Sequence, residues 1–356
     1  MRKKGSSGKG HNRREFIKVG GAITAGLLAH VALPENIHAR PGMPQGLSAP
    51  EAMPTRNLGR TGWRVAIFGL GGQAALEIKN HDEVAVPIIT RALDLGVNYI
   101  DTSSIYGGPE RWSERYVGQV MKKRRAEAFL ASKTKERTRD ASLRMLEESL
   151  KLLETDHLDL WQLHDVGTMG EVSQIFGKGG ALEALTEARE QRMVRFLGLT
   201  GHFRPEPLME AMRRFPFDCI LMALSAADPH HFSFREKLLP MAVEQQMGII
   251  GMKIPGRGRL LSSWTPPPIE EQKRSWEGVV IAAGPGTLQM REALYYTLSH
   301  PVSTVVIGCD SIAQLEENVR LAREFTPLSE KQMAALQDKA APVSKQALFF
   351  RFFDRA

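Results

Sequence analysis

The chain of 356 residues contains only two cysteines, Cys219 and Cys309, and each lies in an apolar run. Their spacing matches no metal-binding motif and nothing in the sequence supports a disulfide between them, so both are predicted to be free, buried thiols. The sequence also has no set of His, Asp and Glu residues at metal-ligand spacing, and the pair His230–His231 is interpreted as part of a loop. Metal-assisted hydrolysis therefore has poor support, and no metal ligand is predicted.

Outside its first 39 residues the chain has little net charge. The formal charge of +7 divides into seven Lys or Arg against two Asp or Glu within residues 1–39, and 40 against 38 in the remainder. The remainder has no basic stripe interleaved with aromatic residues. Because proteins that bind nucleic acids carry such a basic footprint, no nucleic-acid partner is expected.

The uncharged run Val19–Leu33 is too short to cross a bilayer, because it has 15 residues and a spanning helix needs about 20. No stable membrane span is therefore predicted. The segment before it, Asn12-Arg13-Arg14-Glu15-Phe16-Ile17-Lys18, resembles the twin-arginine (Tat) signal of bacterial export. Residues 1–39 are predicted to be this signal peptide, cleaved near Ala39, which implies recognition by the Tat export machinery and a periplasmic or other extracytoplasmic location. The alternative is a disordered basic tail followed by a surface helix.

Residues 40–55 contain Pro41, Pro44, Pro50 and Pro54 and are predicted to form an extended linker. Helical patterns and strand-like runs alternate beyond it. The segment Glu83–Leu95 is predicted to be a helix closed by Gly96, and Asp140–Leu153 places its leucines on one helical face. The eight strand candidates are Val65–Leu70, Val97–Asp101, Ala128–Lys133, Leu158–His164, Val194–Thr200, Asp218–Leu224, Gly248–Lys253 and Ser303–Gly308.

Eight strands with interposed helices favour a closed parallel barrel over an open doubly wound sheet. An open sheet that binds a dinucleotide would be expected to show a Gly-x-Gly-x-x-Gly turn after its first strand, and Gly69-Leu70-Gly71-Gly72 lacks that spacing. Residues 56–341 are therefore predicted to form a single (β/α)8 TIM barrel, which is an α/β fold.

Two segments interrupt the regular alternation. Residues 256–286 are predicted to be a long irregular loop after the seventh strand, bordering the active site because they follow the C-terminal end of a strand. Residues 342–356 form an aromatic tail with Phe349, Phe350, Phe352 and Phe353. Packing of this tail onto the barrel is the preferred interpretation, and a lid over the substrate site or a contact with a partner is the alternative.

Four polar residues lie at or just after the ends of consecutive strand candidates. Asp101 and Tyr106 belong to Asp-Thr-Ser-Ser-Ile-Tyr, Lys133 to Ala-Ser-Lys-Thr, and His164 to Leu-Asp-Leu-Trp-Gln-Leu-His. In (β/α)8 enzymes the C-terminal ends of the strands carry the chemistry. In this order and context, the four residues resemble the catalytic tetrad of the aldo/keto reductases, and the resemblance extends over roughly residues 56–325.

The resemblance implies hydride transfer between a nicotinamide cofactor, NADPH or NADH, and a small-molecule carbonyl or alcohol. Tyr106 would be the general acid, and the ammonium group of Lys133 would lower the phenol pKa from about 10. Asp101 would compensate the buried charge of Lys133, and His164 would donate a hydrogen bond to the substrate oxygen. The alternative function is a cofactor-holding barrel that acts mainly as a redox-sensing or partner-binding subunit.

The resemblance also implies a cofactor across the barrel mouth, with phosphates near the seventh and eighth strands. Thr200-Gly201-His202 stands where many members have Ser-Asn, and Leu221 where a Gln is common. Asp310 replaces the cations that select a 2′-phosphate, so NADH is expected to compete more effectively than in typical members. The predicted cofactor contacts are Gly71, Thr200, His202, Met252, Lys253, Gly256, Gly258, Gly308, Ser311, Gln314, Glu317 and Asn318.

Overall fold

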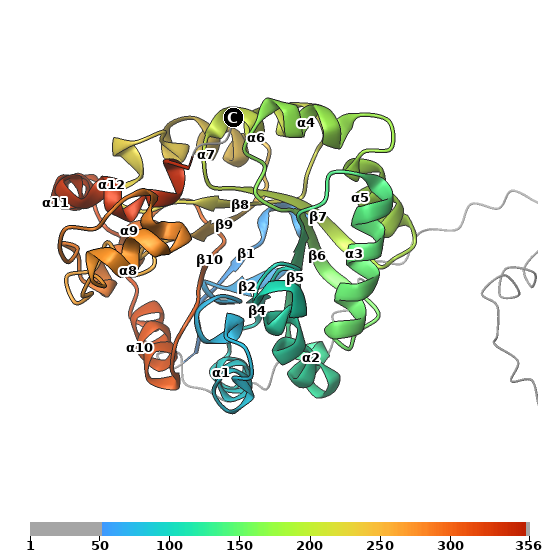
Figure 1. Cartoon of the computed structure of the whole chain (residues 1–356), viewed down its shortest axis with the longest axis horizontal. Coiled ribbons are helices and arrows are strands. Elements are labelled where there is room, and N and C mark those ends of the chain that lie inside the picture. The colour runs from blue at the N-terminus through green and yellow to red at the C-terminus, as the bar shows by residue number, and fades with distance from the viewer. Residues whose placement is uncertain (1–51, 354–356) are drawn as a thin grey trace, which may run out of the picture. The chain divides into compact units, whose positions relative to one another are not determined.

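The computed structural model describes residues 52–353, so the predicted signal peptide and residues 40–51 of the predicted linker lie outside the described part. Eight parallel strands close into a barrel in the order β10-β3-β4-β5-β6-β7-β8-β9, which confirms the predicted fold class (Figure 1). The barrel strands are β3 (Phe68–Gly71), β4 (Tyr99–Asp101), β5 (Phe129–Thr134), β6 (Leu158–Leu163), β7 (Val194–Gly201), β8 (Cys219–Ala223), β9 (Gly248–Met252) and β10 (Thr304–Ile307).

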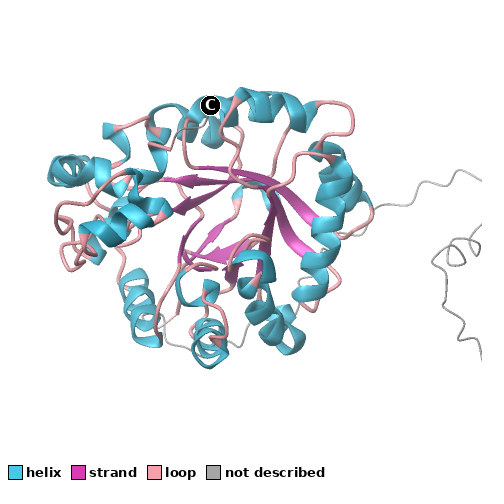
Figure 2. Cartoon of the chain, in the orientation of Figure 1, coloured by secondary structure: helices cyan, strands magenta, loops and turns pink. Residues whose placement is uncertain are grey.

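Helices surround the strands, as Figure 2 shows by colour. The two helices expected from the sequence are confirmed with small shifts, and α3 buries Leu146 and Leu150 as its leucine spacing predicts. The helices are α1 (Asp82–Asp94), α2 (Trp112–Arg124), α3 (Arg139–Leu152), α4 (Met169–Phe176), α5 (Ala181–Glu190), α6 (Pro205–Arg214), α7 (Phe234–Glu244), α8 (Ile269–Arg274), α9 (Met290–Leu298), α10 (Ile312–Arg323), α11 (Glu330–Ala340) and α12 (Ser344–Ala347).

The barrel has two apolar cores because successive residues of a strand face opposite sides of the sheet. One core fills the barrel interior and includes Tyr99, Phe129, Cys219 and Ile250. The larger core lies between the strands and the surrounding helices. Both cysteines are buried and free, as predicted, with Cys309 in the outer core.

The first predicted strand, Val65–Leu70, is in fact two strands. Its beginning belongs to β2 (Arg64–Ala66), which pairs antiparallel with β1 (Thr55–Asn57), whereas its end is the barrel strand β3. Leu58 and Val65 of this hairpin contribute to the interior core. The hairpin therefore covers one end of the barrel, where Leu58 packs beside Gly248 at the start of β9.

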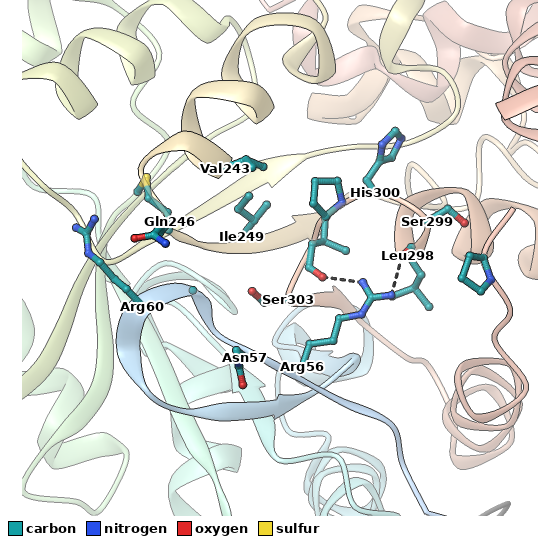
Figure 3. A pocket seen from close by; sticks show the side chains of 15 residues that line it. Arg56, Asn57, Arg60, Val243, Gln246, Ile249, Leu298, Ser299, His300 and Ser303 are labelled. Carbon is teal, nitrogen blue, oxygen red and sulfur yellow. Dashed lines mark hydrogen bonds between the residues drawn. The ribbon is translucent and has the colours of Figure 1, made fainter. Parts of the chain in front are cut away.

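Arginine side chains attach the hairpin to the ends of helices. Arg56 donates to the carbonyl oxygens of Leu298 at 2.9 Å and Val302 at 2.7 Å (Figure 3). Arg60 donates to the carbonyl oxygen of Gln245, just after α7, at 2.6 Å. Carbonyl groups at a helix C-terminus have no partner inside the helix, so these guanidinium groups satisfy the carbonyl groups of Leu298 and Gln245. The pocket in Figure 3 therefore lies where the hairpin is attached to the rest of the fold, at the end of the barrel where the strands begin.

The segment 256–286 is not wholly irregular, because it contains α8 and a short 3-10 helix, Trp276–Val279. The aromatic tail packs onto the barrel, as the preferred interpretation predicted: Phe349 and Phe350 are buried in the outer core. Arg351 of the tail forms a fully buried ion pair with Asp228. Apolar packing and this ion pair therefore hold the tail against the barrel.

None of the helices within residues 52–353 has the length and apolar character needed to cross a membrane. The same residues contain no group of three or more His, Cys, Asp and Glu side chains placed to hold a metal ion.

Candidate active site

The four residues of the predicted tetrad meet at the C-terminal ends of β4, β5 and β6. Asp101 is the last residue of β4, Lys133 lies next to the end of β5, and His164 directly follows β6. The loop after β4 brings Tyr106 back over them, so that its ring lies 5.1 Å from Lys133 Nζ and 5.7 Å from the His164 ring, centroid to centroid. Residues from three separate segments of the chain are thus brought to one mouth of the barrel.

Local backbone geometry sets the direction of these side chains. In β5, Ser132 points outward and donates to Glu114 of α2 at 2.7 Å, so its neighbour Lys133 points into the barrel. After Tyr106 the chain turns at Gly107, whose φ is 85°. A Cβ atom at Gly107 would lie 2.6 Å from the Trp112 side chain, so only glycine allows this close turn into α2.

Lys133 and Asp101 form a buried ion pair. Lys133 Nζ donates to Asp101 Oδ2 at 2.6 Å and to the carbonyl oxygen of Thr102 at 2.7 Å. Burial lowers the pKa of Lys133 and raises the pKa of Asp101, and the attraction between the two charges opposes both shifts. The pair therefore depends on both partners, because removal of either leaves an uncompensated buried charge.

The expected effect of Lys133 on Tyr106 is not found. The pKa of Tyr106 is raised well above its usual range, first by burial and then by the carboxylate of Asp101. The reason is geometric, since the ammonium group donates to Asp101 and faces the Tyr106 ring. Tyr106 is consequently a protonated phenol at neutral pH, able to donate a proton although burial makes it a weaker acid than a free phenol in this state.

His164 is a neutral imidazole. Its pKa lies well below the usual range, first because the ring is buried and then because of the positive charge of Lys133. Nδ1 of His164 lies 2.9 Å from Oγ of Ser103, a buried serine two residues after Asp101. Sequence reasoning missed Ser103, although it lies inside the stretch Asp101–Tyr106 that carried the prediction.

Asp165 is a second residue that sequence reasoning missed, although it directly follows His164. Its carboxylate binds Lys135 Nζ at 2.7 Å and His202 Nδ1 at 2.8 Å. Its backbone N–H donates to Thr200 Oγ1 at 3.1 Å. The hydroxyl of Thr200 and the ring of His202, both predicted to contact the cofactor, thus organise the loop around Asp165, and Phe350 of the tail packs against His202.

A cavity of about 610 Å³ opens beside the tetrad. It is lined by Asp101 and Tyr106, and also by Leu221 and Asp310. A volume of this size is typical of sites for small molecules and cofactors. The predicted cofactor contacts that line it are Gly71, Met252, Lys253, Gly258, Gly308, Gln314, Glu317 and Asn318.

The other four predicted contacts, Thr200, His202, Gly256 and Ser311, are not among the residues that line this cavity. Gly256 has a φ of 56°, and a Cβ atom there would lie 2.6 Å from the carbonyl oxygen of Ala347 in the tail. Ser311 caps α10 by accepting from the Gln314 N–H at 3.2 Å. The side chain of Gln314 in turn accepts from Asp310 N at 2.8 Å.

Side chains from two loops meet across the cavity. Lys253, after β9, donates to Gln73 Oε1 at 2.9 Å, and Arg257 binds Glu77 Oε1 at 3.0 Å. Burial, and then the charge of Arg257, lowers the pKa of Lys253 to about 8. The sequence pattern had marked Gly71 in this region but gave no sign that Gln73 and Glu77 reach the loop after β9.

A family model for the aldo/keto reductase family matches residues 67–341. The chain belongs to the aldo/keto reductase family. The protein is therefore an oxidoreductase that transfers hydride between a nicotinamide cofactor, NADPH or NADH, and a carbonyl or alcohol. The sequence-based assignment to this family and to its reaction is confirmed.

Individual relatives agree with this assignment. The chain is 27% identical over 310 residues to the uncharacterized oxidoreductase YqkF of Bacillus subtilis, covering 80% of this chain and 96% of that protein. It is 27% identical over 301 residues to L-galactose dehydrogenase of Arabidopsis thaliana, covering 78% and 90%. The holo structure of the aldo-keto reductase AKR11C1 from Bacillus halodurans is similar, with a TM-score of 0.65 and 27% identity over 83% of this chain and 99% of that one.

Proposed function

We propose that this aldo/keto reductase reduces a small carbonyl compound with Tyr106 as the general acid. When bound, the reduced nicotinamide supplies the hydride that adds to the carbonyl carbon. The Tyr106 hydroxyl gives its proton to the carbonyl oxygen, and His164 donates a hydrogen bond to the same oxygen as negative charge develops on it. The observation that carries this proposal is that Tyr106, a protonated phenol, lines the cavity with its ring against neutral His164.

Lys133 and Asp101 assist the proton transfer without contacting the substrate oxygen. Lys133 is completely buried under the Tyr106 ring, and Asp101 holds it in place. Once Tyr106 loses its proton, the nearby ammonium group stabilises the phenolate that remains. The ion pair therefore acts mainly on the product side of the proton transfer, because the phenol itself has a raised pKa before the reaction.

The cavity fits an extended anionic dinucleotide. Lys253 supplies positive charge on the loop after β9, where phosphate groups would be held, and Arg257 lies nearby in ion pairs with Glu77 and Glu277. Near α10 the lining changes to Asp310, Gln314, Glu317 and Asn318, and none of the lining residues there is a cation. Because a 2′-phosphate placed near Asp310 would be repelled, we propose that NADH competes well with NADPH in this protein.

The Tyr106→Phe variant tests the proposed reaction. Consumption of NADH or NADPH is followed by absorbance with a panel of aliphatic, aromatic and hydroxylated aldehydes. The variant is expected to bind cofactor normally and to lose ~10²–10⁴-fold in kcat, which is the range for a lost general acid. Reduction at nearly the wild-type rate would remove Tyr106 from this role. A wild-type protein that binds cofactor tightly but reduces no carbonyl would favour the redox-sensing subunit instead.

We further propose that the reductase is exported through the twin-arginine route. The support is the segment Asn12–Lys18 with Arg13 and Arg14, followed by the uncharged run Val19–Leu33. The full chain and its Arg13→Lys, Arg14→Lys double variant are expressed in a bacterium with this pathway, and periplasmic and cytoplasmic fractions are compared by immunoblot. Export is expected for the first chain only. Equal periplasmic amounts of both would reject the signal.

A further inference from the structure

One buried hydroxyl group contacts the imidazole of His164. Oγ of Ser103 lies 2.9 Å from Nδ1, and the two residues are 0% and 3% exposed. Ser103 lies in the loop between β4 and α2, in the same stretch as Asp101 and Tyr106. This hydrogen bond therefore ties the loop that carries the proposed acid to the residue that follows β6.

The direction of this hydrogen bond follows from the number of available acceptors. If Nδ1–H donated to Ser103 Oγ, the serine proton would need a second acceptor. Within residues 52–353, His164 Nδ1 is the single hydrogen-bond partner of that oxygen. A buried donor without an acceptor is strongly disfavoured, so the arrangement that satisfies both groups has the Ser103 O–H donating to Nδ1.

The protonation of the other ring nitrogen follows. Burial and the neighbouring charge of Lys133 keep the pKa of His164 well below its usual range, so the ring carries one proton. An imidazole that accepts at Nδ1 must hold that proton at Nε2. If the substrate oxygen lies beside Nε2, as the proposed function requires, the opposite tautomer would turn a lone pair toward that oxygen and repel the negative charge that develops there.

We propose that Ser103 is a positioning residue that fixes His164 in the tautomer with its proton on Nε2, ready to donate to the substrate oxygen. The position of the substrate in this inference rests on the proposed function. The tautomer itself does not, because it is a property of the protein without substrate.

Nitrogen NMR of protein labelled at histidine tests the proposal directly. The His164 signals are assigned by their loss in His164→Gln. Wild-type protein is expected to show a protonated Nε2 and a hydrogen-bonded, unprotonated Nδ1. Ser103→Ala is expected to show a mixture of tautomers and a kcat reduced roughly 10-fold, less than the ~10²–10³-fold loss from deleting an oxyanion donor.

Two further variants separate this role from a structural one. Ser113 of α2 is also buried, with Oγ 2.8 Å from Thr102 Oγ1, so Ser113→Ala removes a neighbouring hydroxyl contact without touching His164. It is expected to leave the His164 signals unchanged, whereas Ser103→Thr, which keeps a hydroxyl, should restore the wild-type tautomer. A proton on Nδ1 in wild-type protein, or an unchanged tautomer in Ser103→Ala, would overturn the proposal. Either result is independent of whether the protein reduces any carbonyl.

Discussion

Lys133 Nζ lies 2.6 Å from Asp101 Oδ2, and the side chains of these two residues are 0% and 4% exposed. The pair joins two neighbouring strands, β4 and β5, at the floor of the proposed active site. Because both groups are buried, each charge is stabilised by its partner and not by water. The ion pair thus both stabilises the mouth of the barrel and holds the Lys133 ammonium group beneath the Tyr106 ring.

Asp101→Asn should destabilise the protein by about 3–5 kcal/mol, because it leaves the buried ammonium group of Lys133 without a counter-charge. The free energy of unfolding is measured by urea denaturation. The matched control is Asp140→Asn, whose ion pair with Arg139 is on the surface, with the Asp140 side chain 73% exposed. That change should cost at most about 1 kcal/mol. Equal losses in the two variants would contradict the compensating role of Asp101.

Cofactor affinity should fall as the pH rises above about 8, the pKa to which burial and Arg257 lower Lys253. Below this pH Lys253 is protonated and attracts an anionic dinucleotide, and above it the free protein must take up a proton before binding. The dissociation constant for NADH is measured by fluorescence titration across this range. Lys253→Arg stays charged and should show a weaker pH dependence. A flat profile in wild-type protein would show that Lys253 does not contact the cofactor.

Asp310→Arg should shift cofactor preference toward NADPH by roughly 10-fold or more, because it replaces repulsion of a 2′-phosphate by attraction. The dissociation constants of both cofactors are measured for each protein. Asp338→Arg, an exposed position on α11, changes the net charge equally and should leave the ratio unchanged. A hundredfold preference of the wild-type protein for NADPH would reject the role assigned to Asp310.

Gly256→Ala should destabilise the protein more than Gly62→Ala does. Both glycines have positive φ, 56° and 76°, so each alanine has a backbone cost of about 1–2 kcal/mol. Only at Gly256 would the new Cβ atom also meet the tail, 2.6 Å from the carbonyl oxygen of Ala347, whereas Gly62 has nothing within 4 Å. Urea denaturation measures the difference, and limited proteolysis should cleave the tail of Gly256→Ala sooner. Equal effects would show that the tail does not constrain Gly256.

The barrel and most of the proposed tetrad were predictable because they depend on patterns of neighbouring residues along the chain. Apolar runs at regular intervals define strands, and residues at their C-terminal ends must meet at one mouth of a closed barrel. The resemblance of the surrounding motifs to the aldo/keto reductase tetrad then marked Asp101, Lys133 and His164 as the candidates at that mouth. The split of Val65–Leu70 into β2 and β3 was missed because β1 is only three residues long and its pairing is not visible in an apolar pattern.

The sequence by itself determined that the chain forms a closed parallel barrel, because strand-like runs and helical patterns alternate along it. Its motifs, by their resemblance to the aldo/keto reductases, also determined the family and the four residues of the tetrad. Tertiary structure alone decided what those side chains do to one another. The raised pKa of Tyr106, the hydrogen bond between Ser103 and His164 and the attachment of Thr200 and His202 to Asp165 all arise where separate segments of the chain pack together. Such effects depend on burial and on distances of a few ångströms, and neither quantity is encoded by neighbours in sequence.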